Sequence, residues 1–273
     1  MPAFVSFIKK SDMKKNTFYW LLLILPFLFV GCLETTEELT LAENGSGTYR
    51  YVLDLKGLFE MLENMKSMDT SAHADMGFPK ERKDTTINLR DFADTAATLT
   101  AEQKALYRNA TVNLLMDEKQ KQFNITMNLP FDKPDDATKM ARLLSSDESG
   151  GMLSKLFEKN KVMGNEGGSS NGKMPDLNSF FDMAVAKGSI ERKLNKVKYD
   201  SVMQVYGSQF SAEGMGDMLE SVKMNTIVHL PRAAKKITGS KVVASADKKT
   251  ITLNGNLADL FKNPQVFSYR VEY

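Results

Sequence analysis

The sequence predicts an α+β fold in which N-terminal and C-terminal hairpins form one antiparallel sheet, with helices packed on one face. Three observations favour this class. Apolar and polar residues alternate, as in half-buried strands, near residues 39–55 and again over the last fifty residues. Helical spacing dominates several stretches between these two regions. The apolar share of 42% is ample for a globular core.

An unbroken apolar run of 13 residues, Phe18 to Val30, precedes the predicted domain. A membrane-spanning helix needs ~20 such residues, whereas the core of a secretory signal needs ~7–15 and a positive flank. Lys14 and Lys15 supply that flank. We therefore predict a signal peptide over residues 1–31 and a single α+β domain over residues 32–273. Met13 is a normal start for such a signal, so translation from Met1 and from Met13 are both left open.

The end of this run, Leu28-Phe29-Val30-Gly31-Cys32, resembles the lipobox of bacterial lipoproteins, with Phe29 at a place where leucine is usual. The resemblance implies that the Cys32 thiol receives a diacylglyceryl group and that the signal is cut before Cys32. It also implies acylation of the new amine by a fatty acid such as palmitate. The expected partner is thus a membrane, through the lipid anchor at Cys32. Leu33 stands where an aspartate would signal inner-membrane retention, so we expect the outer membrane, with the leaflet left open.

Charge and cysteine content exclude several classes of function. Residues 1–31 carry a net charge of +3, and removing them from the whole chain's +2 leaves −1. A near-neutral mature chain argues against nucleic acid as a partner. Cys32 is the only cysteine, so no disulfide is expected, and the two histidines, His73 and His229, cannot form a clustered metal site by themselves. We expect no metal and no cofactor.

The first strand begins soon after Cys32, which places the domain close to the membrane. Leu39 and Leu41 alternate with polar residues before a turn, and the strand beyond it alternates through Tyr49. A two-residue loop would place Leu39 opposite Arg50. A three-residue loop, Glu43-Asn44-Gly45 with Gly45 left-handed, places Leu39 opposite Tyr49 and gathers the apolar residues on one face. We predict the second register.

The middle of the chain predicts further hairpins and helices. A helix carries Leu58, Met61, Leu62, Met65 and Met68, and one or two short helices lie within 91–106. A second hairpin turns at 117–120 and alternates through Ala110, Val112, Leu114 and Met116, then through Phe123, Ile125, Met127 and Leu129. A helix containing Met140 follows, capped by Asp135 or Asp136, and another is expected around 152–157.

Residues 164–172 predict a flexible loop rich in Gly, Ser and Asn. A helix through Phe180, Phe181 and Val185 is expected next, then a strand over 190–197 and helices around 202–206 and 215–222. The C-terminal part predicts a strand over 224–230, a short helix at 257–261 and a final strand over 267–273. Between them, a hairpin pairs Val243 with Leu253 and Ser245 with Ile251.

Two parts of the chain resemble a family. Glu38 to Leu41, Asn44 to Tyr49 and Asp54 look like the opening of a group of uncharacterised Bacteroidota lipoproteins. The residues from Val228 to Leu253 are similar to the closing hairpins of that group, and loosely similar to the LppM-type envelope lipoprotein domain. The resemblance implies an α+β domain of the cell envelope and no catalytic residues.

Candidate chemistry is sparse. Met61 and Met65 share a helical face, which indicates adaptable core packing or, as a functional alternative, a groove for an apolar ligand. His229 is interpreted as a satisfied histidine of a sheet rather than a general base. Asp132, Asp135 and Asp136 lack the glycine and distal glutamate of a calcium loop.

The first functional hypothesis is a non-enzymatic binding or assembly module of the bacterial envelope, with an apolar ligand or an envelope protein as partner. The alternative is a hydrolase that uses carboxylates such as Asp54, Asp91 and Glu272. A purely structural lipoprotein is a further alternative. Buried, adjacent carboxylates in a pocket would favour the hydrolase.

Overall fold

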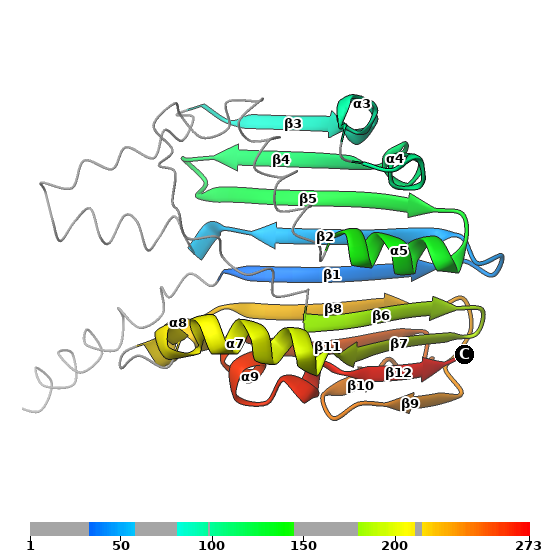
Figure 1. Cartoon of the computed structure of the whole chain (residues 1–273), viewed down its shortest axis with the longest axis vertical. Helices are drawn as coiled ribbons and strands as arrows, with labels where there is room; N and C mark the ends of the chain where they lie inside the picture. Colours follow the sequence, from blue (N-terminus) through cyan, green and yellow to red (C-terminus); the bar gives the residue numbers. More distant parts are fainter. Residues whose placement is uncertain (1–32, 58–80, 98, 145–179, 211–214) are drawn as a thin grey trace, which may run out of the picture.

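The computed structural model describes residues 33–57, 81–97, 99–144, 180–210 and 215–273 (Figure 1). Within them, strands form a main sheet in the order β10-β11-β8-β1-β2-β5-β4-β3 and a second sheet in the order β6-β7-β12-β9. The main sheet contains β1 (Glu34–Leu41), β2 (Gly47–Asp54), β3 (Lys83–Asn88), β4 (Thr111–Asp117), β5 (Gln122–Phe131), β8 (Lys223–His229), β10 (Val242–Ala244) and β11 (Thr250–Asn256). The second contains β6 (Phe181–Ala186), β7 (Ser189–Leu194), β9 (Lys236–Thr238) and β12 (Tyr269–Glu272).

The α+β class is confirmed, and the N-terminal and C-terminal hairpins meet in the main sheet as predicted. They meet at β1 and β8, which are parallel, although every other strand pair in the two sheets is antiparallel. A parallel pair needs a crossover that returns the chain to the same end of the sheet. Here α7 (Lys196–Phe210) and α8 (Met215–Ser221) lead the chain back to the end at which β1 begins (Figure 1).

The second sheet was not expected from the sequence. The final strand β12 belongs to it, between β7 and β9, and not to the main sheet. The helix predicted through Phe180, Phe181 and Val185 is wrong, because this segment forms β6. Phe181, Met183 and Val185 are all buried while the residues between them are exposed, which is the period of a strand. Gly188, at φ +89°, allows the tight turn into β7.

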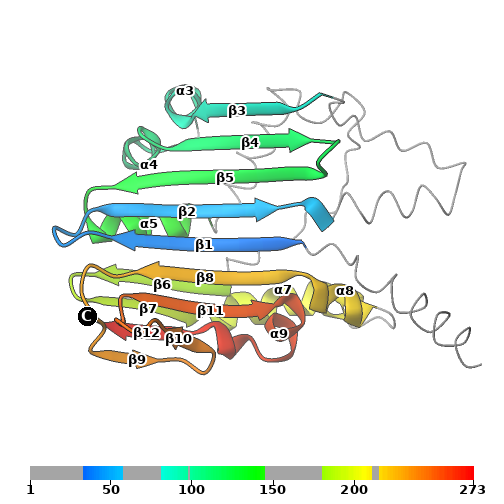
Figure 2. The same cartoon turned by 180° about the vertical axis from the view of Figure 1, so that it is seen from behind.

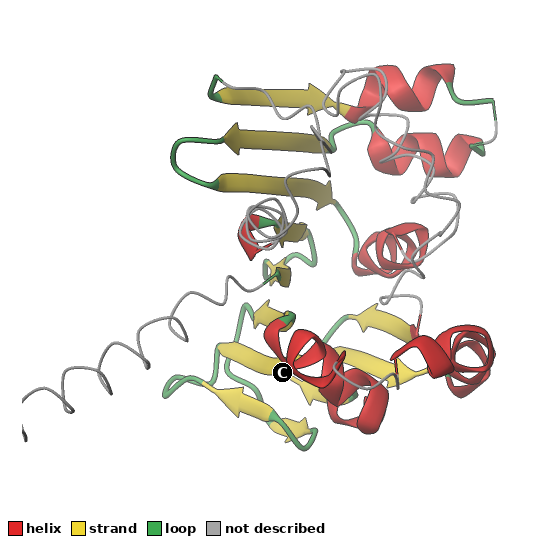
Figure 3. Cartoon of the chain, turned by 90° about the vertical axis from the view of Figure 1, so that its left-hand side faces the viewer, coloured by secondary structure: helices red, strands yellow, loops and turns green. Residues whose placement is uncertain are grey.

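The helices do not form a single layer over one face of the main sheet. The described helices, besides α7 and α8, are α3 (Leu89–Thr95), α4 (Ala101–Tyr107), α5 (Pro134–Leu144), α9 (Leu257–Lys262) and the 3-10 helix η3 (Pro264–Phe267). Helix α5 lies against β2, β5 and β6, whereas α3 and α4 lie beyond one end of β3 and β4 (Figures 1 and 3). Asp135 and Asp136 lie in the first turn of α5, which begins at Pro134, so they do not occupy the capping position.

The register of the first hairpin is confirmed. Leu39 pairs with Tyr49, and the Ala42 amide donates to the Ser46 carbonyl at 2.8 Å, which encloses Glu43, Asn44 and Gly45. Gly45 has a φ of +89°, the left-handed conformation that a three-residue loop of this kind requires. The second hairpin also keeps its two apolar sets together, with Leu114 opposite Ile125, although its turn spans 118–121.

The register predicted for the β10–β11 hairpin is wrong by one residue. Val242 pairs with Leu253 and Ala244 with Ile251, so Val243 faces solvent and is 63% exposed. The turn holds four residues, because Lys248 takes a positive φ and the Asp247 carboxylate accepts from the Lys249 amide. One extra residue in a turn moves every side chain of the strand to the other face.

Residues buried between the two sheets and under α5 form one apolar cluster. The most completely buried of them include Leu39, Phe123, Leu129, Met140, Phe180, Ile190, Phe267 and Val271. We call the side of the main sheet that contributes to this cluster the inner face and the opposite side the outer face. The helices predicted around 58–68 and 152–157 and the loop at 164–172 lie outside the described residues.

Candidate functional site

A buried ion pair joins the two sheets at their centre. Arg192, on β7, donates from Nη1 to Glu37 Oε2 on β1 at 2.5 Å and to Thr226 Oγ1 on β8 at 3.1 Å. Arg192 is 5% exposed and Glu37 is 9% exposed. The guanidinium also lies 4.4 Å above the centre of the Phe181 ring, a cation–π contact. This network is the most polar group in the described interior.

Two buried tyrosines flank the ion pair. Burial, reinforced by the Glu37 carboxylate, raises the pKa of Tyr49 well above its ordinary value, and burial likewise raises the pKa of Tyr269. Burial alone would lower the pKa of Arg192, but the Glu37 carboxylate and its hydrogen bond outweigh burial, and the pKa of Arg192 is raised. Tyr269 pairs with Arg192 across β12 and β7, and its hydroxyl has no hydrogen-bond partner in the described structure. The raised pKa values keep the Arg192 guanidinium charged and the two phenols neutral.

The side chains of this pair are only 5% and 11% exposed, so the network is part of the packing between the two sheets. The pair joins β7 to β1 and β8, and removal of one partner would leave an uncompensated charge buried between the sheets. Sequence reasoning missed it. The sequence does contain a signal: in each strand, a charged residue occupies a position where the alternation predicts an apolar, inward-facing residue. Arg192 lies between Ile190 and Leu194, and Glu37 lies two residues before Leu39.

A second polar cluster lies on the outer face. Glu38 Oε1 lies 3.0 Å from His229 Nε2, and Glu38 Oε2 accepts from Arg50 Nη1 at 3.0 Å. His229 Nδ1 lies 3.3 Å from Thr250 Oγ1. Both ring nitrogens of His229 thus have a partner, in agreement with the interpretation of a satisfied sheet histidine. The side chains of this cluster are partly exposed.

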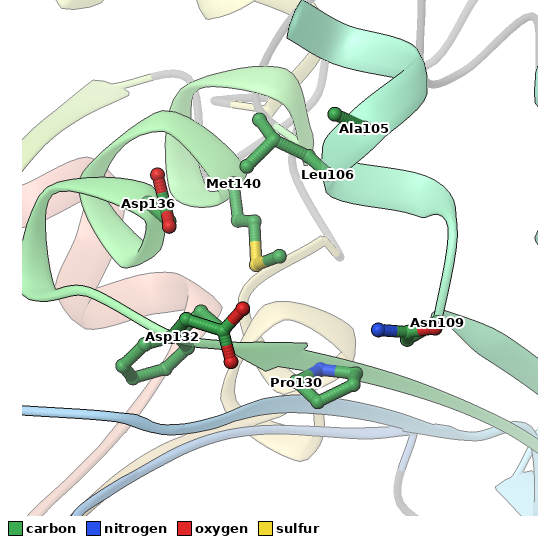
Figure 4. Close-up of a pocket in the computed structure, with 8 residues that line it drawn as sticks. Ala105, Leu106, Asn109, Pro130, Asp132, Asp136 and Met140 are labelled. Atoms are coloured by element: carbon green, nitrogen blue, oxygen red, sulfur yellow. The ribbon is translucent and has the colours of Figure 1, made fainter.

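A small pocket lies where α4, α5 and the end of β5 meet (Figure 4). Its volume is about 70 Å³, and Leu106, Asn109, Asp132, Asp136 and Met140 are among the residues that line it. Ligand pockets typically enclose about 300–1,000 Å³. The pocket has room for water and is too small for an acyl chain or a cofactor.

The predicted site residues are not gathered in one place. Cys32, Met61 and Met65 lie outside the described residues. Of the carboxylates considered for a hydrolase, Asp54 ends β2, Asp91 lies in the first turn of α3, and Glu272 lies on β12 beside Arg270. Asp54 and Glu272 therefore belong to different sheets, and Asp91 belongs to a helix beyond the far end of β3.

The described residue nearest to Cys32 is part of the fold. The Leu33 carbonyl accepts from the Lys223 amide at 2.8 Å, and the Leu33 side chain is partly buried against the core. β1 begins at the next residue, Glu34. The position predicted for lipidation is thus separated from the main sheet by Leu33 alone.

Two features are absent from the described residues. No helix among them has the length and apolar character to cross a membrane. No group of three or more His, Cys, Asp or Glu residues in the described ranges is arranged to hold a metal ion.

No family model matches the chain, and no curated protein matches it. Among solved structures, the NMR structure of the folded domain of the Mycobacterium tuberculosis protein LppM is similar. The TM-score is 0.36 and the sequence identity 7%, over 89% of this chain and 90% of that chain. The resemblance to the LppM-type domain is therefore seen in structure only as a loose similarity of fold, which carries no argument about function.

Proposed function

We propose that this chain is a lipid-anchored protein of the bacterial envelope whose folded domain acts as a non-enzymatic binding or assembly module. The observation that carries the proposal is Cys32, the only cysteine, placed directly after Gly31 and an apolar run of signal-peptide length. Each buried methylene contributes ~0.8 kcal/mol, and two or more acyl chains hold a protein stably where one does not. Acylated Cys32 would fix the domain to a membrane.

The outer membrane is the location we propose, because Leu33 replaces the aspartate that would signal inner-membrane retention. A protein that stays at a membrane surface has its partners there. We propose an envelope protein or an apolar ligand as that partner. Met61 and Met65 are the residues we assign to an apolar ligand, since flexible thioether side chains adapt to irregular apolar surfaces.

The non-enzymatic part of the proposal is supported by how the described polar groups are arranged. The Arg192–Glu37 pair is buried between the sheets, and the polar groups of the half-exposed Glu38–His229–Arg50 cluster are paired with one another. A general acid or base needs a pocket that holds its substrate within hydrogen-bond reach. The described pocket of about 70 Å³ is too small for that role.

The anchor is tested by fractionation. The wild-type protein should enter the detergent phase in detergent partitioning and sediment with outer membranes, whereas Cys32→Ser should leave an unlipidated precursor. Cys32→Ala gives the same result if the thiol is what matters. If either variant still fractionates with outer membranes in detergent partitioning, the lipid is not what holds the protein there.

The apolar-ligand assignment is tested by binding of a labelled lipid or a hydrophobic dye. We expect saturable binding in the wild type and a loss of binding in the double variant Met61→Glu, Met65→Glu. The double variant Val205→Glu, Val243→Glu is the matched control, since both valines are exposed and the same two charges are added elsewhere. Absence of saturable binding in the wild type would remove the ligand from the proposal and leave a protein partner.

A further inference from the structure

Leu33 is the only residue between the predicted anchor at Cys32 and the first strand, β1, and it is held in the fold. Leu33 is held by the hydrogen bond from the Lys223 amide and by its contacts with the core. Consecutive Cα atoms are 3.8 Å apart, so the Cα atom of Cys32 lies one such step from Leu33 and two from the first residue of β1. An acylated Cys32 lies at the level of the lipid headgroups, and the beginning of β1 must therefore lie there too.

The beginning of β1 is near the middle of one end of the main sheet. β1 has β8, β11 and β10 on one side and β2, β5, β4 and β3 on the other. At this end Glu34 pairs with both Asp54 and Lys223, and Lys223 pairs with Asn256. Neighbouring strands are about 4.8 Å apart, so these residues lie within about 10 Å of the entry point. We call this edge of the fold the anchor end.

We infer that the domain stands on its anchor end, with β1 pointing away from the bilayer and this edge of the sheet in contact with lipid headgroups. The inference rests on the proposed lipid anchor at Cys32. β1 is 8 residues long and rises ~3.3 Å per residue, so the opposite end of the sheet lies about 25 Å farther from the membrane. The outer face then stands upright and is accessible from the side.

The chemistry of the anchor end fits a headgroup layer. Lys56 and Lys223 are exposed there, and Asp54 and Glu220 supply charges of the opposite sign close by. Side chains of both signs suit headgroups that carry both a phosphate and an ammonium group. Lying on the outer face would instead press the partly exposed Glu38–Arg50 ion pair against the lipid.

The orientation can be measured with single tryptophan reporters. Trp20 is the only tryptophan and lies in the segment predicted to be removed, so the mature lipoprotein contains none. Lys223→Trp and Lys56→Trp report on the anchor end. Lys249→Trp reports on the opposite end, because Thr250 pairs with His229 at the far end of β8, and Arg50→Trp reports on the outer face. All four side chains are exposed.

Each lipidated variant is placed in phosphatidylcholine vesicles that contain a lipid with a nitroxide on its headgroup. We expect strong fluorescence loss for Lys223→Trp and Lys56→Trp and little loss for Lys249→Trp and Arg50→Trp. Loss for Arg50→Trp as great as for Lys223→Trp would show that the domain lies flat and would overturn the inference. Equal small losses at all positions would overturn it as well, by placing the domain away from the lipid.

The mass of each variant separates failure of this inference from failure of the proposed function. A lipidated protein with the wrong quenching pattern contradicts only the orientation. A protein without added lipid mass contradicts the anchor on which the orientation rests. Unchanged circular dichroism shows that each substitution leaves the fold intact.

Discussion

The two faces of the main sheet differ although the same strands form both. Glu37 and Glu38 are neighbours on β1, yet Glu37 points inward to a buried arginine, whereas Glu38 points outward to Arg50 and His229 at a half-exposed position. Identical side chains thus have different surroundings one residue apart, because successive side chains of a strand alternate between faces. The environment, and not the residue type, determines how much each carboxylate contributes to stability.

The outer face is rich in uncharged polar residues. One row of cross-strand partners, from β11 to β3, consists of Asn254, Asn225, Thr36, Val52, Thr126, Asn113 and Thr86. Figure 2 shows this side of the sheet, where no described helix lies in front of β1, β2, β4 and β5. The inner face carries the core. We therefore expect substitutions on the inner face to change stability and substitutions on the outer face to leave it nearly unchanged.

The largest expected effect is at the buried ion pair. Arg192→Met leaves the Glu37 carboxylate buried without its cation, which should cost about 3–5 kcal/mol of unfolding free energy. The measurement is urea unfolding of the mature chain carrying Cys32→Ser, followed by circular dichroism. The double variant Glu37→Met, Arg192→Met should recover most of the loss, because no unpaired charge remains. A double variant as unstable as the single one would show that the charges are not what matters.

Adjacent residues of β5 give a direct comparison of the faces. Leu129 is fully buried, and Leu129→Ala should cost about 2–5 kcal/mol through lost contacts and a cavity. Asn128 is the next residue and faces outward, so Asn128→Ala should change the unfolding free energy by less than about 0.5 kcal/mol. Similar losses for the two variants, in the same urea experiment, would contradict the difference between the faces.

A smaller effect is expected where α5 covers the edge of the second sheet. The buried Thr138 hydroxyl accepts from the Val185 amide on β6 at 2.8 Å. Thr138→Val keeps the shape and leaves this amide without a partner, which should cost about 1–3 kcal/mol. Thr138→Ser keeps the hydroxyl and should be more stable than Thr138→Val in thermal unfolding. The reverse order would show that packing of the methyl group is the main contribution.

A small effect is also expected on the outer face, at Glu38. Its ion pair with Arg50 joins side chains that are 24% and 45% exposed. Exposed pairs of this kind contribute about 0.2–1 kcal/mol and are screened by salt. Glu38→Gln should therefore destabilise the domain slightly at low ionic strength and less at high ionic strength. A loss as large as that of Arg192→Met would mean that the two carboxylates are equivalent.

The parts of the fold that could be predicted are those with a strong local pattern. The first hairpin carried both an alternation and a turn residue suited to a left-handed φ, so even its register was predictable. β3 was missed because only Ile87 among its 6 residues is strongly apolar, as befits an edge strand. β6 was mistaken for a helix because two adjacent phenylalanines obscure its alternation. The second sheet could not be foreseen, since which strands pair depends on contacts between distant segments.

The candidate sites show the same difference between a local sequence pattern and contacts between distant segments. The prediction at Cys32 follows from a contiguous motif. The Arg192–Glu37 pair joins residues 155 positions apart, so the local pattern in each strand does not say which residue is the partner. The register of the β10–β11 hairpin was predicted wrongly by one residue, because the positive φ at Lys248 accompanies a longer turn than the one predicted. Sequence reasoning predicts the anchor from a local motif, whereas tertiary contacts decide which polar residues are buried.

The most direct test of the account is the intact mass and N-terminal residue of the protein extracted from membranes of its native host. The account predicts a chain that begins at Cys32 and carries the added mass of a diacylglyceryl group and an amide-linked acyl chain. The Cys32→Ser variant should keep its signal peptide and carry no lipid. A wild-type protein that begins elsewhere, or that begins at Cys32 without added lipid mass, would contradict the account.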